Sequence, residues 1–511
     1  MTIALQQAQV IPQAADYIRI LPELILSLFG IAVMLIDPVV DEEKSQKTLG
    51  ILAFVGTVVA LISTWYMGAN PGLAFSRTIR IDSFSIFFTF LVIAIAAVVI
   101  LSSFEYMAVQ RIRAGEYYAL ILFGVVGMVL MASAIELVMI FIGLEISSIS
   151  TYILAGFRRN DAASSESSLK YFLLGSFATA FFLYGVALMF GATGSTNIDT
   201  IAQRLQSEPV GLLAYAAMAL MFVGLGFKVA AAPFHVWTPD VYEGAPAPVV
   251  GFMSTAPKAA AFAVLLRVVF AINAPGRFWF LWVAAALSMT LGNIGALVQT
   301  NVKRLLAYSS IAHAGYVLVA FAMTSQETFA NGISAAMFYT AAYAAMNVGA
   351  FAVVSHFANA GERYVTLEDY EGLGRSSPFL AATLTIFLLS LIGIPVTGGF
   401  FAKFYVFSAA LRANLIWLTL IGVVNSAIGA YYYLRIIVVM YMREARKEVP
   451  VTRISFGVAT ALTVSIVATL YLGLLPNRVL QIAQHAAQDL LPPASSMSAA
   501  QTAPAASLPQ R

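Results

Sequence analysis

The sequence predicts an all-α membrane protein with about fourteen transmembrane helices. Of its 511 residues, 60% are hydrophobic and only 10% are charged, and the mean hydropathy is +0.86, far from the values of soluble globular domains. Apolar runs of about 17–25 residues recur along the chain, and each is long enough to cross a hydrocarbon core of roughly 30 Å at 1.5 Å per residue.

Fourteen apolar runs fit this description, separated by polar segments. They are 18–36, 47–68, 80–103, 116–134, 136–156, 169–191, 211–232, 247–271, 278–299, 305–323, 332–357, 377–411, 415–441 and 455–475. The first run follows no basic segment and precedes no small-residue cleavage site, so we expect a retained helix rather than a signal peptide. Segment 491–511 is rich in Pro, Ala and Ser, and we expect a disordered tail there.

The distribution of basic residues predicts the orientation. Of the 28 Lys and Arg, fifteen fall in loops on one side, eight fall on the other side and five lie within the apolar runs. Because cytoplasmic loops carry an excess of basic residues, we expect the first side to be cytoplasmic and both termini to be periplasmic.

The composition also excludes several kinds of chemistry. The chain has no cysteine, which rules out disulfides, thiolate catalysis and cysteine-ligated iron–sulfur clusters. The net charge of +3 is small and dispersed and does not suggest a nucleic-acid partner. No spacing typical of a metal site, a P-loop, a dinucleotide fingerprint or a nucleophile elbow occurs. We therefore expect no metal and no cofactor on this chain, and electron transfer only on other chains.

Two of the predicted helices are expected to be discontinuous. Run 377–411 would be about 52 Å long as one straight helix, and the sequence GIPVTGG interrupts it at Pro395, Gly398 and Gly399. The seventh run meets a similar breaker at Pro233. If helices 4–8 and 9–13 are two repeats, the broken helix is fourth in each, and five-helix units in succession must be inverted, as in many secondary transporters.

This repeat predicts the domain organisation. We expect helices 1–3 in 1–115, a first repeat in 116–271, a second repeat in 278–441, and a fourteenth helix in 442–490 before the tail.

Four of the ionisable side chains inside the apolar runs are the candidate functional residues: Glu145, Lys228, Lys258 and Lys403. Removing a charge from water costs several kcal/mol, so groups of this kind usually serve ion or proton movement. Each could instead be structural: a neutral carboxyl bonded to a neighbouring helix, a lysine bonded to backbone carbonyls, or a side chain that extends to the interface.

Other polar residues in the runs carry weaker signals. His235 and His313 are candidates for a proton relay, since imidazole titrates near neutral pH, but either could be structural. Arg267 and Arg435 lie toward helix ends, and we expect structural roles for both. The acidic residues between the eleventh and twelfth runs are expected to form a solvated cytoplasmic face; they are Glu362, Glu368, Asp369 and Glu371.

The segment GFKVAAAPFHVWTPDVYEGAPAPVVGFMSTAPKAA, which contains Lys228 and Lys258, resembles the diagnostic segment of the antiporter-like membrane subunits of respiratory complex I. The resemblance covers nearly the whole chain, including FIGLEISSISTYILAGF, NVKRLLAYSSIAHAGY and GIPVTGGFFAKFYVF. LPELIL and the last of these segments are most similar to the subunit N family of bacterial NADH:quinone oxidoreductases. The chain departs from the family pattern at Val396, where a second proline is expected.

The resemblance implies a translocase subunit that moves protons while NADH reduces quinone on other subunits, which would carry NADH, FMN, iron–sulfur clusters and quinone. It implies roles for Glu145 and Lys228 as a pair, for Lys258 as the central lysine and for Lys403 as the outlet, with His313 on the central axis. The partners would be other membrane subunits of complex I and lipid, in a bacterial inner membrane. A stand-alone cation/proton antiporter and a structural scaffold remain alternative functions.

Overall fold

The computed structural model describes residues 12–40, 42–110, 112, 114–207, 210–271, 277–323, 326–358, 360–446 and 453–490. The predicted tail 491–511 lies outside these residues. The described chain is almost entirely helical, apart from a hairpin of β1 (Gly72–Ala74) and β2 (Ile79–Ile81), which pair antiparallel. The predicted all-α class is therefore confirmed.

All fourteen predicted spans are helical, three of them in two pieces. In order they are α2 Leu21–Ile36, α3 Glu42–Gly68, α4 Ser83–Gln110, α5 Gly115–Ser133, α6 Leu137–Ala155, α7 Ala162–Thr193, α9 Leu212–Val229 with α10 Thr238–Gly244, α11 Ala247–Met253 with α12 Ala256–Ala271, α13 Arg277–Leu297, α14 Val302–Val319, α15 Gln326–Ala358, α17 Pro378–Ile392 with α18 Gly398–Arg412, α19 Ile416–Met442 and α20 Phe456–Leu474. Thirteen stretches of the described chain are long and apolar enough to cross a membrane. The broken twelfth span supplies the fourteenth crossing.

Shorter helices lie between and around these spans. They are α1 Ala14–Arg19, α8 Ile198–Ser207, α16 Leu373–Ser376, α21 Pro476–Gln488 and the 3₁₀ helices η1 Asp37–Val39, η2 Ala320–Ala322, η3 Ala360–Glu362 and η4 Leu367–Tyr370.

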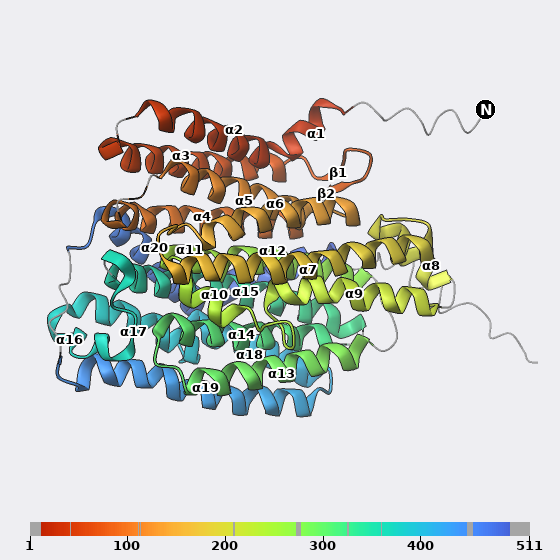
Figure 1. Cartoon of the computed structure of the whole chain (residues 1–511). Helices are drawn as coiled ribbons and strands as arrows, with labels where there is room; N and C mark the ends of the chain where they lie inside the picture. Colours follow the sequence, from red (N-terminus) through yellow and green to blue (C-terminus); the bar gives the residue numbers. More distant parts are fainter. Residues whose placement is uncertain are drawn as a thin grey trace, which may run out of the picture.

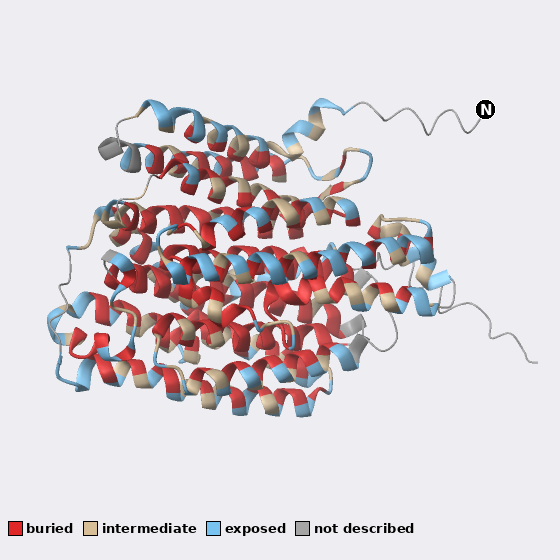
Figure 2. Ribbon diagram, viewed as in Figure 1, coloured by how far each residue is buried: buried red, intermediate tan, exposed pale blue. Residues whose placement is uncertain are grey.

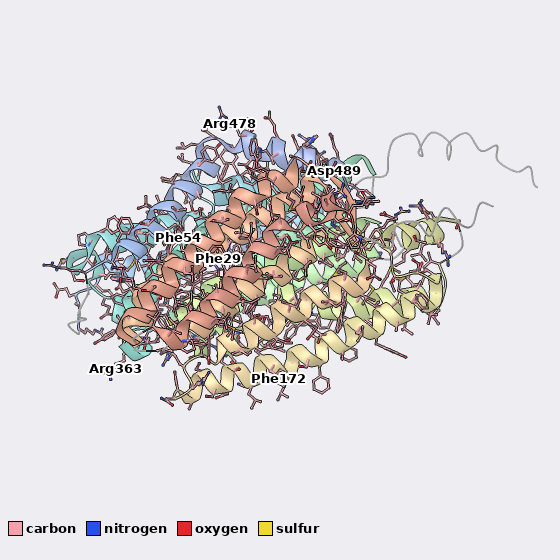
Figure 3. All side chains as sticks on the ribbon, turned by 90° about the horizontal axis from the view of Figure 1, so that it is seen from above. Phe29, Phe54, Phe172, Arg363, Arg478 and Asp489 are labelled. Atoms are coloured by element: carbon pink, nitrogen blue, oxygen red, sulfur yellow. The ribbon has the colours of Figure 1, made fainter. Side chains whose placement is uncertain are left out.

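The long helices run side by side, with α2 and α3 along one edge and α13 and α19 along the opposite edge (Figure 1). Burial increases toward the middle of the molecule (Figure 2). Every residue in the most apolar stretch of the span Ala247–Val269 is buried, whereas only 28% of the corresponding stretch of Leu21–Val39 is buried. Seen from above, α7 lies at the rim, where Phe172 points away from the molecule (Figure 3). Outer helices thus expose apolar side chains, as a lipid-facing surface requires.

Both predicted helix breaks are present. After α9, the chain turns at Ala230, which has a φ of 59°, and α10 begins eight residues later at Thr238. In the twelfth span α17 ends at Ile392, and α18 begins at Gly398. Val396 lies in this second break with a φ of 75°, a left-handed conformation that is strained for a β-branched residue.

The eighth span contains a third, short break, which lies between Met253 at the end of α11 and Ala256 at the start of α12. Pro257 lacks the N–H that would bond to the carbonyl of Met253, where α11 ends. The Thr255 hydroxyl donates to the carbonyl of Gly251 at 2.7 Å, which offers the backbone a second partner within the turn. The break lies just before Lys258.

One backbone pattern occurs twice at the starts of α6 and α14. Glu136 caps α6 and bridges Asn197, with Leu137 N bonded to Thr196 O and Ile198 N bonded to Ile135 O. In the same way, the α14 cap bridges the loop after α15, through Asn301 with Thr366, Val302 N with Val365 O, and Leu367 N with Thr300 O. The two sites are five spans apart, as an inverted five-helix repeat requires. The boundaries at 116–271 and 278–441 stay predictions.

Candidate functional site

Lys258 lies in the centre of the helix bundle on α12 and is 3% exposed. Its ammonium donates to the hydroxyl of Ser310 on α14 at 2.6 Å and to the Ser310 carbonyl at 3.3 Å. Tyr343 of α15 donates to the same hydroxyl at 2.7 Å. The Ser310 hydroxyl therefore accepts two hydrogen bonds and has its own proton left to donate.

His313 lies one turn beyond Ser310 on α14 and is 2% exposed. Its Nδ1 is 2.8 Å from the Tyr339 hydroxyl, and its Nε2 is 3.2 Å from the Tyr433 hydroxyl. The ring of Tyr343 lies 5.1 Å from the imidazole, between centroids. His313 thus has polar partners on both nitrogens, and Tyr343 contacts both His313 and the group that holds Lys258.

Lys403 is held at the break of the twelfth span. Its ammonium donates to the carbonyls of Leu391 and Ile392 at 3.1 and 2.8 Å, which belong to the end of α17, and to the Ser426 hydroxyl at 2.7 Å. It also lies 5.1 Å from the ring centroid of Tyr316, which packs edge-on against His313. The break supplies carbonyls that a continuous helix would use internally.

Lys228 lies near the end of α9 and is 6% exposed. Its ammonium is 4.9, 5.3 and 5.7 Å from the ring centroids of Tyr152, Tyr171 and Phe227. Trp237 stacks on Tyr171 at 4.5 Å, and its indole N–H donates to the carbonyl of Phe227 at 3.0 Å. We call Tyr152, Tyr171, Phe227 and Trp237 the aromatic cage. The faces of such rings attract a desolvated cation.

Glu145 is less buried than the sequence indicated. It is half-buried on a face of α6 whose other residues are exposed, at positions 138, 142, 149 and 153. Its Oε1 is buried without a hydrogen-bond partner in the described chain, and within that chain Glu145 forms no ion pair with Lys228. Glu145 therefore lies at the outer surface of this chain, next to the aromatic cage but not inside it.

The side chain of His235 forms no hydrogen bond, within the described chain, with the groups around Lys258, His313 and Lys403. It is half-buried in the segment between α9 and α10, and its Nδ1 has no hydrogen-bond partner among the described residues. The two arginines have structural contacts, as expected. Arg267 pairs with Asp82 at 2.8 Å, and Arg435 donates to the carbonyls of Leu297 and Gln299.

The expected solvated acidic face was wrong for three of its four residues. Glu362, Asp369 and Glu371 are buried, at 8%, 6% and 5% exposure. Glu362 accepts from Lys303 at 2.6 Å, from the backbone N–H of Ala247 at 2.7 Å and from Tyr106 at 2.8 Å. Burial alone would raise the pKa of Glu362, but Lys303 and these donors bring it below the ordinary value of 4.5.

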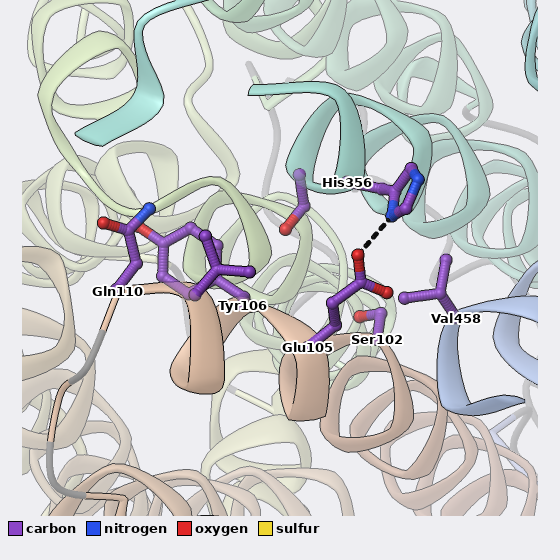
Figure 4. A pocket seen from close by; sticks show the side chains of 8 residues that line it. Ser102, Glu105, Tyr106, Gln110, His356 and Val458 are labelled. Carbon is purple, nitrogen blue, oxygen red and sulfur yellow. Dashed lines mark ion pairs between the residues drawn. The ribbon is translucent and has the colours of Figure 1, made fainter. Parts of the chain in front are cut away.

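A hollow between the C-terminal parts of α4 and α15 contains another ionisable pair, in which Nδ1 of His356 lies 2.7 Å from a carboxylate oxygen of Glu105 (Figure 4). Within the described chain, no hydrogen bond links this pair to the lysines at the middle of the molecule. No group of three or more His, Asp or Glu that could hold a metal ion occurs in the residues described.

Sequence reasoning found the lysines but missed the groups that hold them. These are Ser310, Ser426, Tyr339, Tyr343, Tyr433 and the aromatic cage. One signal was available: in YSSIAHAGY the two serines precede His313 by four and three residues and therefore share its helix face.

Comparisons with known proteins identify the family of the chain. A family model described as NADH:quinone oxidoreductase/Mrp antiporter, TM matches residues 134–429. The NADH-quinone oxidoreductase subunit N 2 of Koribacter versatilis is 67% identical over 484 residues, covering 93% of this chain and 98% of the relative. The subunit N 1 of Solibacter usitatus is 49% identical and covers 93% and 98%.

Solved structures give the same result. A chain of respiratory complex I from Thermus thermophilus has a TM-score of 0.77 at 37% identity and covers 91% of this chain and 99% of its own length. A chain of the Mrp complex from Dietzia has a TM-score of 0.80 at 21% identity, which shows a shared fold. The chain belongs to the family of NADH-quinone oxidoreductase N subunits.

Proposed function

We propose that this chain moves protons across the membrane through Lys228, Lys258 and Lys403, with Glu145 as the charge that controls entry and His313 as a relay between Lys258 and Lys403. As a subunit of NADH:quinone oxidoreductase, it couples proton translocation to electron transfer from NADH to quinone in other subunits. Those subunits would hold FMN, the iron–sulfur clusters and the quinone. The chain would lie in the bacterial inner membrane with both termini periplasmic, among other membrane subunits of the complex.

One observation carries this proposal: Lys258, His313 and Lys403 lie in neighbouring buried sites lined by hydroxyl groups, and ring contacts of Tyr343 and Tyr316 connect these sites. Ser310 and Tyr343 hold Lys258, Tyr339 and Tyr433 bond to His313, and Ser426 holds Lys403. Hydroxyls both donate and accept, so each can pass a proton between neighbours. Two lysines and a histidine kept only for structure would not need hydroxyl partners of this kind.

The outward position of Glu145 changes the expected control step. Because Glu145 is half-buried on the outward face of α6, a charge on a neighbouring subunit can draw it away from Lys228 or release it. Opposite charges about 4 Å apart interact by about 4 kcal/mol at an effective dielectric near 20. Moving one charge through 100 mV costs about 2.3 kcal/mol. Making and breaking one contact at Glu145 is thus large enough to gate one proton.

The aromatic cage stabilises the charged form of Lys228. Cation–π contacts are worth about 2 kcal/mol or more when the cation is desolvated. They can hold the ammonium while Glu145 is engaged elsewhere. His235, outside the central cluster, would act only as a peripheral relay.

The test is the Lys228→Met variant in the assembled complex, reconstituted into proteoliposomes. We expect the complex to assemble and to pump fewer protons per electron. Lys47→Met is the matched control, because this lysine is exposed and lies near the start of α3. Undiminished pumping by Lys228→Met, with normal assembly, would show that Lys228 does not carry protons.

The shared fold with an Mrp chain keeps a cation/proton antiporter as the alternative function. That function predicts sodium-dependent proton flux by the isolated chain in liposomes. A scaffold predicts instead that neutralising Lys258 leaves both assembly and pumping intact.

A further inference from the structure

The aromatic cage and the Lys258 group are not joined by any hydrogen bond within the described residues, yet a proton must cross between them if the proposed function holds. The short helix α10 lies in this gap. It packs against α7, which carries Tyr171 of the cage, and against α14, which carries Ser310. The break after Lys228 lets the chain turn, so that α10 lies against both helices.

Tyr242 is the residue of α10 that faces both sides of the gap. Its side chain is completely buried. Its ring packs edge-on against Trp237 of the cage, with 5.9 Å between the centroids. Its hydroxyl lies beside the Ser310 hydroxyl and close to those of Tyr171 and Tyr343. Tyr242 is thus in contact with the surroundings of Lys228 and of Lys258 at once.

The Tyr242 hydroxyl is buried and has no hydrogen-bond partner in the described chain. A buried hydroxyl left unpaired costs free energy, and native structures keep few of them. The neighbouring Ser310 hydroxyl accepts from Lys258 and Tyr343 and has a proton that no described group accepts. An unpaired acceptor therefore lies beside an uncommitted donor, directly next to Lys258.

We propose that Tyr242 is the proton relay between Lys228 and Lys258, an inference that rests on the proposed function. The Lys228 ammonium gives a proton to the Tyr242 oxygen, directly or through water. Once Lys258 is neutral it no longer donates to Ser310, so the Ser310 oxygen can accept the Tyr242 O–H proton while the Ser310 proton passes to the neutral amine of Lys258. One proton enters and one leaves at each oxygen, so both hydroxyls end as they began.

Tyr242→Phe tests this inference because it removes only the hydroxyl. Since that hydroxyl has no hydrogen-bond partner among the described residues, its loss leaves none of them unsatisfied, and we expect normal assembly. Two other tyrosines are matched controls: Tyr118 on α5 and Tyr370 on η4 are also fully buried with unpartnered hydroxyls, and neither contacts the lysines. The measurement is NADH-driven proton uptake by proteoliposomes that contain the whole complex, with electron transfer followed in parallel.

We expect Tyr242→Phe to cause at least half of the loss of pumping that Lys258→Met causes, and Tyr118→Phe and Tyr370→Phe to cause none. Normal pumping by Tyr242→Phe, with pumping lost in Lys258→Met, would overturn the relay and leave the proposed function standing. Normal pumping by Lys258→Met would overturn both. Equal losses in all three Phe variants, or failed assembly of Tyr242→Phe alone, would show a structural role and also overturn the relay.

Discussion

Lys303 on α14 and Glu362 in the loop after α15 form a buried ion pair. Exchanging the two residues separates the effect of their opposite charges from the effect of their hydrogen bonds to the backbone. The side chains are 1% and 3% exposed, and their charged atoms are 2.6 Å apart. Lys303 also donates to the carbonyl of Ala245 at 2.6 Å, and Glu362 accepts from the N–H of Ala247 at 2.7 Å. The pair therefore forms hydrogen bonds with the backbone at Ala245 and Ala247, in the junction between α10 and α11.

The single change Glu362→Gln leaves the Lys303 ammonium buried without its counter-charge. Breaking a buried pair in this way costs about 3–5 kcal/mol. The exchange Lys303→Glu with Glu362→Lys restores opposite charges at these two positions, but it also places an ammonium beside Arg158, which pairs with Glu362 at 3.3 Å. In addition, a carboxylate cannot donate to Ala245 and an ammonium cannot accept from Ala247. Two hydrogen bonds to charged groups are lost, at about 1.5–3 kcal/mol each, so we expect the exchange to recover little stability.

The assay is the unfolding midpoint of the purified complex, followed with a probe on this subunit. The exchange of Arg80 with Asp199 is the control, because that pair is about a quarter exposed and joins no helix junction by backbone contacts. We expect the control to stay near the wild type. A Lys303/Glu362 exchange as stable as the wild type would refute the role of the backbone contacts.

Three further predictions concern stability and assembly. Because the pKa of Glu362 is lowered in the folded chain, its stabilising effect is present above pH 4.5 and is lost as the pH falls below that value. Glu362→Gln should therefore weaken the decrease of the unfolding midpoint at acid pH. An unchanged decrease would contradict this role of Glu362. Val396→Gly should raise the free energy of unfolding by roughly 0.5–1 kcal/mol, and with it the midpoint, since glycine accepts a φ of 75° without strain. A lower midpoint would count against strain at this position. Gly127→Val should prevent assembly, measured as the amount of intact complex, because a Cβ at Gly127 would meet the carbonyl of Gly143 at 2.5 Å and push α6 away; normal assembly would show that the two helices can separate at little cost.

Much of the fold follows from the sequence because length and hydropathy decide which segments cross a membrane. The break near Pro395 was also predictable, since the span is too long for one helix and its breakers are adjacent. The break before Lys258 was missed, although Pro257 marks it, because the apolar run continues on both sides. Apolar composition alone does not reveal a turn that is buried in protein.

The lysines were predictable because charged residues at membrane depth are rare. The aromatic cage was not, since Tyr152, Tyr171 and Trp237 come from three segments and each looks like an ordinary core residue. Glu362 belongs to a loop in the sequence, and only the fold brings it to the start of α11. The outward position of Glu145 depends on which neighbours pack against α6, which periodicity in a uniformly apolar helix does not show.

The central claim is that the buried lysines carry the protons, and the most direct measurement is the number of protons translocated per electron by the Lys258→Met complex. We predict a complex that assembles, still passes electrons from NADH to quinone, and moves fewer protons for each electron. A Lys258→Met complex with the proton-to-electron ratio of the wild type would contradict the account.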